Sequence, residues 1–101
     1  MLTSKQRAQL RGLAATEDTI VHIGKGGITD NIVTQMNDAL KARELVKGRV
    51  LENSLLTARE ACDQLAVTCR AEPVQVIGSK FVLYKRNEQK PKIELVKKAK
   101  R

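Results

Sequence analysis

The sequence predicts an α/β (α+β) fold with the order α-β-α-β-α-β-β and a four-stranded mixed sheet packed by helices. Segments with helical apolar spacing alternate with short runs rich in valine and isoleucine, and polar or glycine-rich stretches separate them. Two strand–helix–strand units followed by a hairpin require both parallel and antiparallel pairing. At 101 residues and 42% hydrophobic composition, the chain can bury one modest core. We expect one domain over residues 1–95 and a basic, frayed tail over residues 96–101.

Three helices are expected, each with a threonine at its start. The first covers residues 3–14, where Thr3 and Gln6 have the spacing of a capping box. The second follows Thr29, a natural N-cap. The third begins between Ser54 and Thr57, and Thr57 with Glu60 also has the spacing of a capping box.

Four strands are expected, over residues 19–23, 44–51, 74–78 and 80–86. The first is an almost continuous apolar run, which is typical of a central strand covered on both faces. His22 lies inside this run, without a serine, cysteine or acid placed by the sequence to form a triad with it. We therefore interpret His22 as a structural residue.

The second strand alternates between charged and apolar residues. Lys47 and Arg49 fall on one face, opposite Val46 and Val50. Gly48 weakens this strand and indicates either a bulge or a close approach of another group.

The two cysteines are predicted to be core residues. Cys62 and Cys69 are seven positions apart in a helical pattern, which separates their Cα atoms by about 10 Å, too far for a disulfide. With His22 as the sole imidazole, no Cys/His zinc site is available. No metal site and no cofactor are expected.

A glycine-rich loop joins the first strand to the second helix. Glycines there allow a ligand to approach the backbone, and a helix N-terminus favours an anion. The loop lacks the pattern of a nucleoside-triphosphate loop, and it does not continue as a dinucleotide motif. We interpret it as a phosphate-binding site, with candidate contacts Gly24, Lys25, Gly26, Gly27 and Thr29. The alternative is an ordinary turn, because many glycine pairs only make turns.

The charge is high and uneven. The chain carries a net charge of +8, and residues 73–101 contain nine Lys/Arg against two Asp/Glu. Such an excess favours a polyanionic partner over a membrane surface, for which the basic end has few bulky apolar anchors. No apolar run reaches the roughly 20 residues of a membrane span, and the N-terminus lacks an apolar secretory core, so a cytoplasmic protein is expected.

Aromatic residues are scarce, which decides how a nucleic acid would be held. The chain has one Phe and one Tyr, whereas proteins that stack bases on rings need several. We therefore expect phosphates and RNA shape to dominate recognition. Beyond the loop, the candidate contacts are Lys47, Arg49, Lys80, Lys85 and Arg86, together with Arg7 and Arg11 on the first helix. A solvated face, or a strand edge protected against aggregation, is the alternative for these cations.

Several strings resemble the CRM domain (chloroplast RNA splicing and ribosome maturation), in particular its stand-alone bacterial form, the YhbY-like RNA-binding proteins. The likeness runs from about Leu2 to Leu95. The strings that carry it are Ser4-Lys5-Gln6-Arg7, Leu10-Arg11-Gly12-Leu13-Ala14, Ile23-Gly24-Lys25-Gly26-Gly27-Ile28-Thr29, Glu44-Leu45-Val46-Lys47, Val74-Gln75-Val76-Ile77-Gly78 and Phe81-Val82-Leu83-Tyr84.

This resemblance implies a sheet similar to the C-terminal domain of a bacterial translation initiation factor. It also implies binding of structured RNA through a GxxG loop, here Gly24–Gly27, and association with precursors of the large ribosomal subunit. The sequence departs from the family pattern at Gly48, where a bulkier apolar residue is usual, and at Arg70-Ala71, where a helix-ending glycine is common.

The resulting hypothesis is a non-enzymatic RNA-binding protein whose partner is large-subunit rRNA or a pre-ribosomal particle, with no membrane and no small-molecule substrate. An Alba-like protein that binds duplex DNA has comparable size and charge and is the alternative. An enzyme is disfavoured, because the acidic residues show no paired spacing suited to acid–base work.

Overall fold

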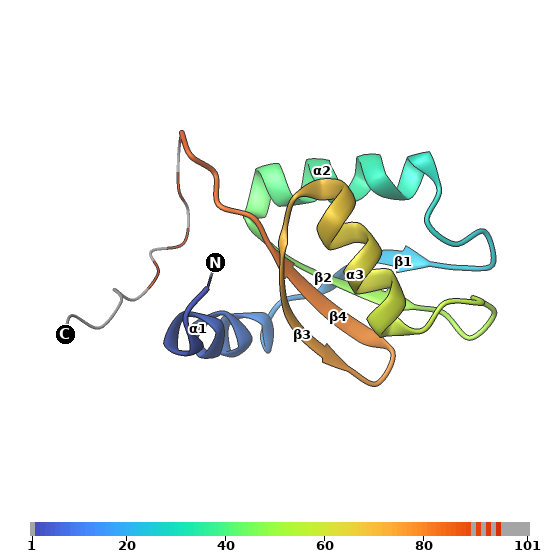
Figure 1. Ribbon diagram of the computed structural model, residues 1–101, viewed down its shortest axis with the longest axis horizontal. Helices are drawn as coiled ribbons and strands as arrows, with labels where there is room; N and C mark the ends of the chain where they lie inside the picture. Colours follow the sequence, from blue (N-terminus) through green and yellow to red (C-terminus); the bar gives the residue numbers. More distant parts are fainter. Residues whose placement is uncertain (1, 90, 92, 94, 96–101) are drawn as a thin grey trace.

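The computed structural model describes residues 2–89, 91, 93 and 95, so the expected tail over residues 96–101 lies outside it. The predicted order of elements is confirmed (Figure 1). The elements are α1 (Ser4–Ala14), β1 (Thr19–Ile23), α2 (Asp30–Arg43), β2 (Leu45–Val50), α3 (Ala58–Cys69), β3 (Glu72–Ile77) and β4 (Lys80–Tyr84).

The four strands form a mixed sheet in the order β1-β2-β4-β3. β1 pairs parallel to β2, and β4 pairs antiparallel to both β2 and β3. The prediction that the first strand is central was wrong, because β1 lies at an edge. Its register with β2 shifts between Thr19 and Val21, and both Ile20 and Val21 pack on the same core cluster. Because of this irregularity, the consecutive apolar residues Ile20 and Val21 can pack on one face of the sheet, and the apolar run does not require burial on both faces.

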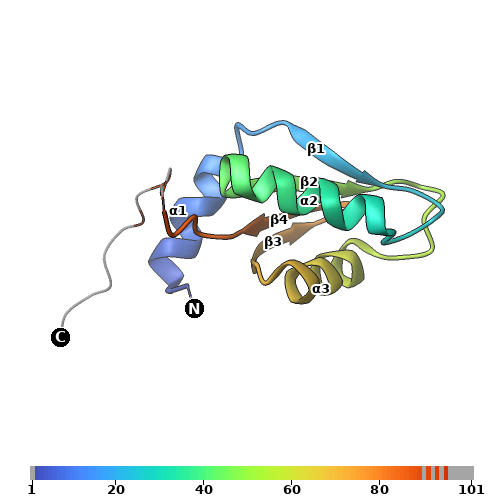
Figure 2. The same ribbon diagram turned by 90° about the horizontal axis from the view of Figure 1, so that it is seen from above.

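Helices cover both faces of the sheet (Figure 2). α2 and α3 share one face, where Val21, Met36, Leu65 and Phe81 belong to the larger cluster of buried side chains. α1 lies on the other face, where a smaller cluster consists of Leu10, Ala14, Leu45, Val74, Val82 and Tyr84. None of the helices in the described part of the chain has the length and apolarity needed to cross a bilayer.

The predicted helix starts are confirmed. Thr3 caps α1 and Thr57 caps α3, and in each case a reciprocal capping box forms with the residue three positions on. Thr29 caps α2, its hydroxyl oxygen accepting a hydrogen bond from the Ile32 N–H at 3.2 Å. Each such cap stabilises its helix by about 1 kcal/mol.

Gly48 is a point of close approach, one of the two alternatives left by the sequence. It pairs with Phe81 across β2 and β4, and the phenyl ring lies over it. A Cβ atom at position 48 would come within 2.4 Å of Phe81 Cζ. The position of the Phe81 ring therefore accounts for a glycine at position 48.

Glu44 connects the end of α2 to the segment that follows β4. It is fully buried, adopts a φ of +65°, and accepts hydrogen bonds from the Asn87 N–H at 2.6 Å and the Ile93 N–H at 2.7 Å. Its carbonyl oxygen accepts a further bond from the Lys85 N–H at 2.9 Å. The fourth strand was predicted to reach Arg86 but ends at Tyr84. Instead of extending the sheet, the next residues turn toward Glu44.

Both cysteines are buried and free, as predicted. Burial, with Asp63 nearby, raises the pKa of Cys62 to about 11, and burial also raises the pKa of Cys69. Because thiolates rather than thiols are nucleophilic, neither side chain is suited to nucleophilic chemistry near neutral pH.

Replacing Arg70 by glycine is expected to stabilise the protein by about 1 kcal/mol. Arg70 is the C-cap of α3 and has a left-handed backbone, with φ +56° and ψ +45°. A non-glycine residue pays a steric cost there, while glycine adds some entropy to the unfolded chain. Urea unfolding measures the difference, and an unchanged or lower midpoint for Arg70→Gly would contradict the expectation.

Candidate nucleic-acid interface

Three connections meet at one end of the sheet. Because β1, β2 and β3 all point the same way, the connections that follow them lie at the same end of the sheet; those after β1 and β2 are on the right in Figure 1, and the β3–β4 turn is at the bottom. Hydrogen bonds join them: the Leu51 N–H donates to the Ile23 carbonyl and the Val50 N–H to the Ser79 carbonyl, both at 2.8 Å. We call this region the loop end.

The Gly24–Gly27 loop turns tightly, with the Gly27 N–H donating to the Gly24 carbonyl at 3.1 Å. Gly27 needs to be glycine, since its φ is +71°. Gly26 does not, because its φ is ordinary and a Cβ there would lie 3.5 Å from Thr29 Cγ2, a normal contact. The fold itself therefore does not require a glycine at position 26. Close approach of a ligand to the backbone at this position would require one.

The N-terminus of α2 is less open to an anion than the sequence indicated. The hydroxyl of Thr29 already accepts the Ile32 N–H, and the exposed Asp30 places a carboxylate in the first turn. A bound phosphate would meet repulsion from that carboxylate. The backbone of the loop and the exposed Lys25 are therefore the better anion contacts.

A row of exposed basic side chains crosses the sheet beside this loop. His22 pairs with Arg49, and Arg49 pairs with Lys80, on three adjacent strands. We call His22, Arg49 and Lys80 the basic row. All three are exposed, on the sheet face opposite α2 and α3, and Ile77 of β3 continues the same line. Because His22 stands two residues before Gly24, the basic row runs directly into the glycine loop.

Two further predicted cations border this row. Arg11 is exposed in the last turn of α1. The half-buried Lys47 lies one step inward on β2 and donates from Nζ to the Ala14 carbonyl at 3.2 Å. Lys47 thus compensates the negative C-terminal end of α1 as well as adding charge to this face.

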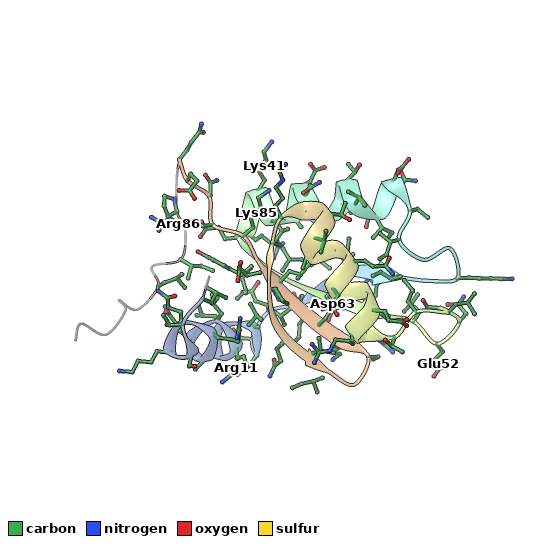
Figure 3. All side chains as sticks on the ribbon, viewed as in Figure 1. Arg11, Lys41, Glu52, Asp63, Lys85 and Arg86 are labelled. Atoms are coloured by element: carbon green, nitrogen blue, oxygen red, sulfur yellow. The ribbon has the colours of Figure 1, made fainter. Side chains whose placement is uncertain are left out.

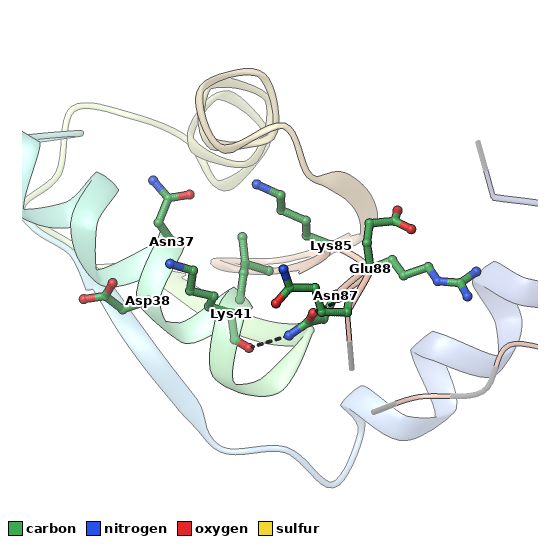
Figure 4. A pocket seen from close by; sticks show the side chains of 9 residues that line it. Asn37, Asp38, Lys41, Lys85, Asn87 and Glu88 are labelled. Atoms are coloured by element: carbon green, nitrogen blue, oxygen red, sulfur yellow. Dashed lines mark hydrogen bonds between the residues drawn. The ribbon is translucent and has the colours of Figure 1, made fainter. Parts of the chain in front are cut away.

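The other predicted contacts lie elsewhere. Lys85 and Arg86 are at the end of the molecule opposite Glu52 of the β2–α3 loop (Figure 3). They border an open hollow of about 790 Å³ at the C-terminal end of α2, where Asn87 Nδ2 donates to the Lys41 carbonyl at 3.5 Å (Figure 4). Carboxylates of Asp38 and Glu88 also line this hollow, so its charge is mixed.

Arg7 stands apart from both places. It is half-buried near Arg59 and β3, and its Nε has no hydrogen-bond partner among the described residues. The structure therefore gathers Gly24, Lys25, Gly26, Gly27, Thr29, Arg49, Lys80, Lys47 and Arg11 around one face and the loop end, and separates Arg7, Lys85 and Arg86 from them.

His22 and Ile77 are surface residues that the sequence analysis did not assign to the site. The interpretation of His22 as a structural residue in a doubly covered strand was wrong, since it is exposed between buried Val21 and Ile23. The polar His22 between Val21 and Ile23 was the signal in the sequence, but Ile20 lengthens the apolar run and conceals the alternation. The exposure of Ile77 had no such signal, because it depends on where α1 stops covering the sheet.

The described residues hold no group of three His, Cys, Asp or Glu side chains that could bind a metal ion.

Fold and surface together define a small, basic α/β protein whose exposed cationic side chains suit a polyanion. The chain belongs to the CRS1/YhbY (CRM) domain family, whose characteristic sequence pattern matches residues 2–85.

Two relatives extend over nearly the whole chain. "Probable RNA-binding protein YqeI" of Bacillus subtilis is 41% identical over 95 residues, covering 94% of this chain and 99% of that protein. "RNA-binding protein" of Haemophilus influenzae is 32% identical over 97 residues, covering 96% and 97%. The solution structure of the hypothetical protein SAV1595 from Staphylococcus aureus has a TM-score of 0.72 and 44% identity, and covers 95% of this chain and 100% of that one. The predicted family and fold are thus confirmed.

Proposed function

We propose that this protein binds structured RNA without catalysing a reaction, through the Gly24–Gly27 loop and the basic row. The observation that carries the proposal is the continuity between the two. The exposed Lys25 and Gly26 follow His22 within four residues along the chain, and His22, Arg49 and Lys80 are exposed neighbours on adjacent strands. The names of the relatives, which are RNA-binding proteins, support RNA as the polyanion.

The proposed setting is the cytoplasmic assembly of the large ribosomal subunit, with rRNA or a pre-ribosomal particle as partner. The support is the CRM likeness together with the positive charge of the chain. Depletion of the protein should alter the profile of ribosomal subunits, and crosslinking in cells should recover large-subunit rRNA. An unchanged profile with no rRNA crosslinks would contradict this setting.

Gly26→Asp is expected to weaken RNA binding by at least about tenfold at low salt, because it sets a carboxylate against bound phosphates. The melting temperature should hardly change, since position 26 has room for a side chain. A salt titration measures both affinity and charge dependence. Each phosphate contact contributes about 0.7 to 0.9 to the log–log slope.

Gln64→Glu on the exposed face of α3 is the matched control, because it adds the same charge away from the loop. If both variants lose affinity equally, net charge rather than the loop is responsible. Duplex DNA that competes as well as structured RNA would instead favour the Alba-like alternative.

A further inference from the structure

A small hollow opens where α1 stops covering the sheet. It has a volume of about 290 Å³ and lies between the last turn of α1 and strands β2, β4 and β3. Its inner wall is apolar, formed by the buried Ala14 and Val82 and by Ile77. Ile77 is 62% exposed, which leaves a large aliphatic side chain in water on an otherwise basic face.

Cations surround this apolar floor. Arg11, Lys47 and Lys80 line the hollow, and the bond from Lys47 Nζ to the Ala14 carbonyl holds one cation at its edge. Lys80 also belongs to the basic row. A phosphate chain lying along that row from β1 therefore reaches the hollow at Lys80 on β4, about 10 Å away for two strand spacings.

No phenyl or phenol ring is exposed for RNA bases to stack on, and the exposed imidazole of His22 lies on β1, at the sheet edge opposite β3 and away from the hollow. The one Phe and one Tyr of the chain, Phe81 and Tyr84, are 1% and 3% exposed. A base that is paired needs no such partner, whereas an unpaired base exposes two flat, weakly polar faces that gain free energy by leaving water. The hollow provides an aliphatic contact for such a face, with cations beside it for the adjoining phosphates.

We propose that this hollow receives one unpaired nucleobase of the bound RNA. The inference rests on the proposed function and narrows the ligand to a structured RNA with an unpaired nucleotide beside a helix. The base lies against Ile77, Ala14 and Val82, and its flanking phosphates lie against Arg11 and Lys80. The basic row and the glycine loop hold the neighbouring backbone.

Ala15→Leu tests the proposal, because Ala15 is exposed, lines the hollow and can be enlarged without a change in charge. Two hairpin RNAs serve as probes, one fully paired and one with a single unpaired nucleotide in its stem. The native protein should bind the second about fivefold more tightly, a modest gain beside ring stacking. Ala15→Leu should remove this preference and leave affinity for the paired hairpin unchanged.

Ala8→Leu, at an exposed position of α1 that does not line the hollow, is the matched control and should keep the preference. Ile77→Thr is a second variant with little risk to folding, since Ile77 is exposed, and it should also reduce the preference. In NMR spectra, the methyl signals of Ile77 and Val82 should shift more with the unpaired than with the paired hairpin.

Equal affinity of the native protein for the two hairpins would overturn the inference, as would equal losses for both in Ala15→Leu. Both results leave the proposed function intact as long as Gly26→Asp weakens binding of either hairpin. If the native protein binds neither hairpin at low salt, the proposed function fails as well.

Discussion

Gly48→Val is expected to lower the free energy of unfolding by about 3 kcal/mol, at the upper end of the usual cost of overpacking a core. The reason is steric. A Cβ at this position would come within 2.4 Å of the Phe81 ring, which is itself only 1% exposed and packed in the larger core cluster. Urea unfolding followed by circular dichroism measures the loss.

The double variant Gly48→Val/Phe81→Leu provides the decisive comparison. The smaller leucine should make room for valine, so the two changes together should cost less than the sum of their separate costs. Gly26→Ala is the control for a glycine with space around it and should change stability little. Strict additivity of the two core changes would show that Phe81 does not require glycine at position 48.

Glu44→Ala is expected to destabilise the protein by about 3 kcal/mol, because it removes a buried carboxylate that accepts two backbone hydrogen bonds. The N–H groups of Asn87 and Ile93 would lose their acceptor. Hydrogen exchange at these two amides should accelerate more than exchange in the middle of β2. The bond from the Lys85 N–H to the backbone carbonyl of residue 44 does not depend on the side chain.

Glu52→Ala is the matched control, since Glu52 is exposed in the β2–α3 loop and its loss should cost less than about 0.5 kcal/mol. Similar exchange at Asn87 in the native protein and in Glu44→Ala would show that the carboxylate does not fix this segment.

Features that depend on neighbouring residues were predictable from the sequence. The capping pairs Thr3–Gln6 and Thr57–Glu60 act over three residues, and both form as expected. The alternation of Lys47 and Arg49 with buried valines likewise follows from strand geometry alone. The hairpin expected from the third and fourth strands also forms, with Gly78 and Ser79 between β3 and β4.

Features set by distant contacts were not predictable in the same way. The edge position of β1 depends on pairing with residues more than twenty positions away, and its apolar run imitates a central strand. The role of Glu44 depends on Asn87 and Ile93, which are 43 and 49 positions away. A buried glutamate between a helix and a strand has no local pattern that identifies its acceptor role.

The candidate site shows the same division. The glycine loop was visible as a string, and its position between β1 and α2 is confirmed. The grouping of the cations was not visible in the sequence, because Arg49 and Lys80 are brought together only by the pairing of β2 with β4. Lys85 follows the opposite end of β4 from Lys80. Roles in RNA binding for all of these residues stay predictions.

The smaller core cluster has a practical consequence for handling the protein. Leu2, near the beginning of the chain, packs on this cluster together with Ile93 and Leu95. The cluster includes Leu45 and Tyr84, at the end of the sheet far from the glycine loop. An affinity tag, a fluorophore or a sensor surface attached N-terminal to Leu2 would therefore keep the Leu2 contacts and leave the loop end facing solution. Immobilised binding measurements can use this attachment without shielding the surface under test.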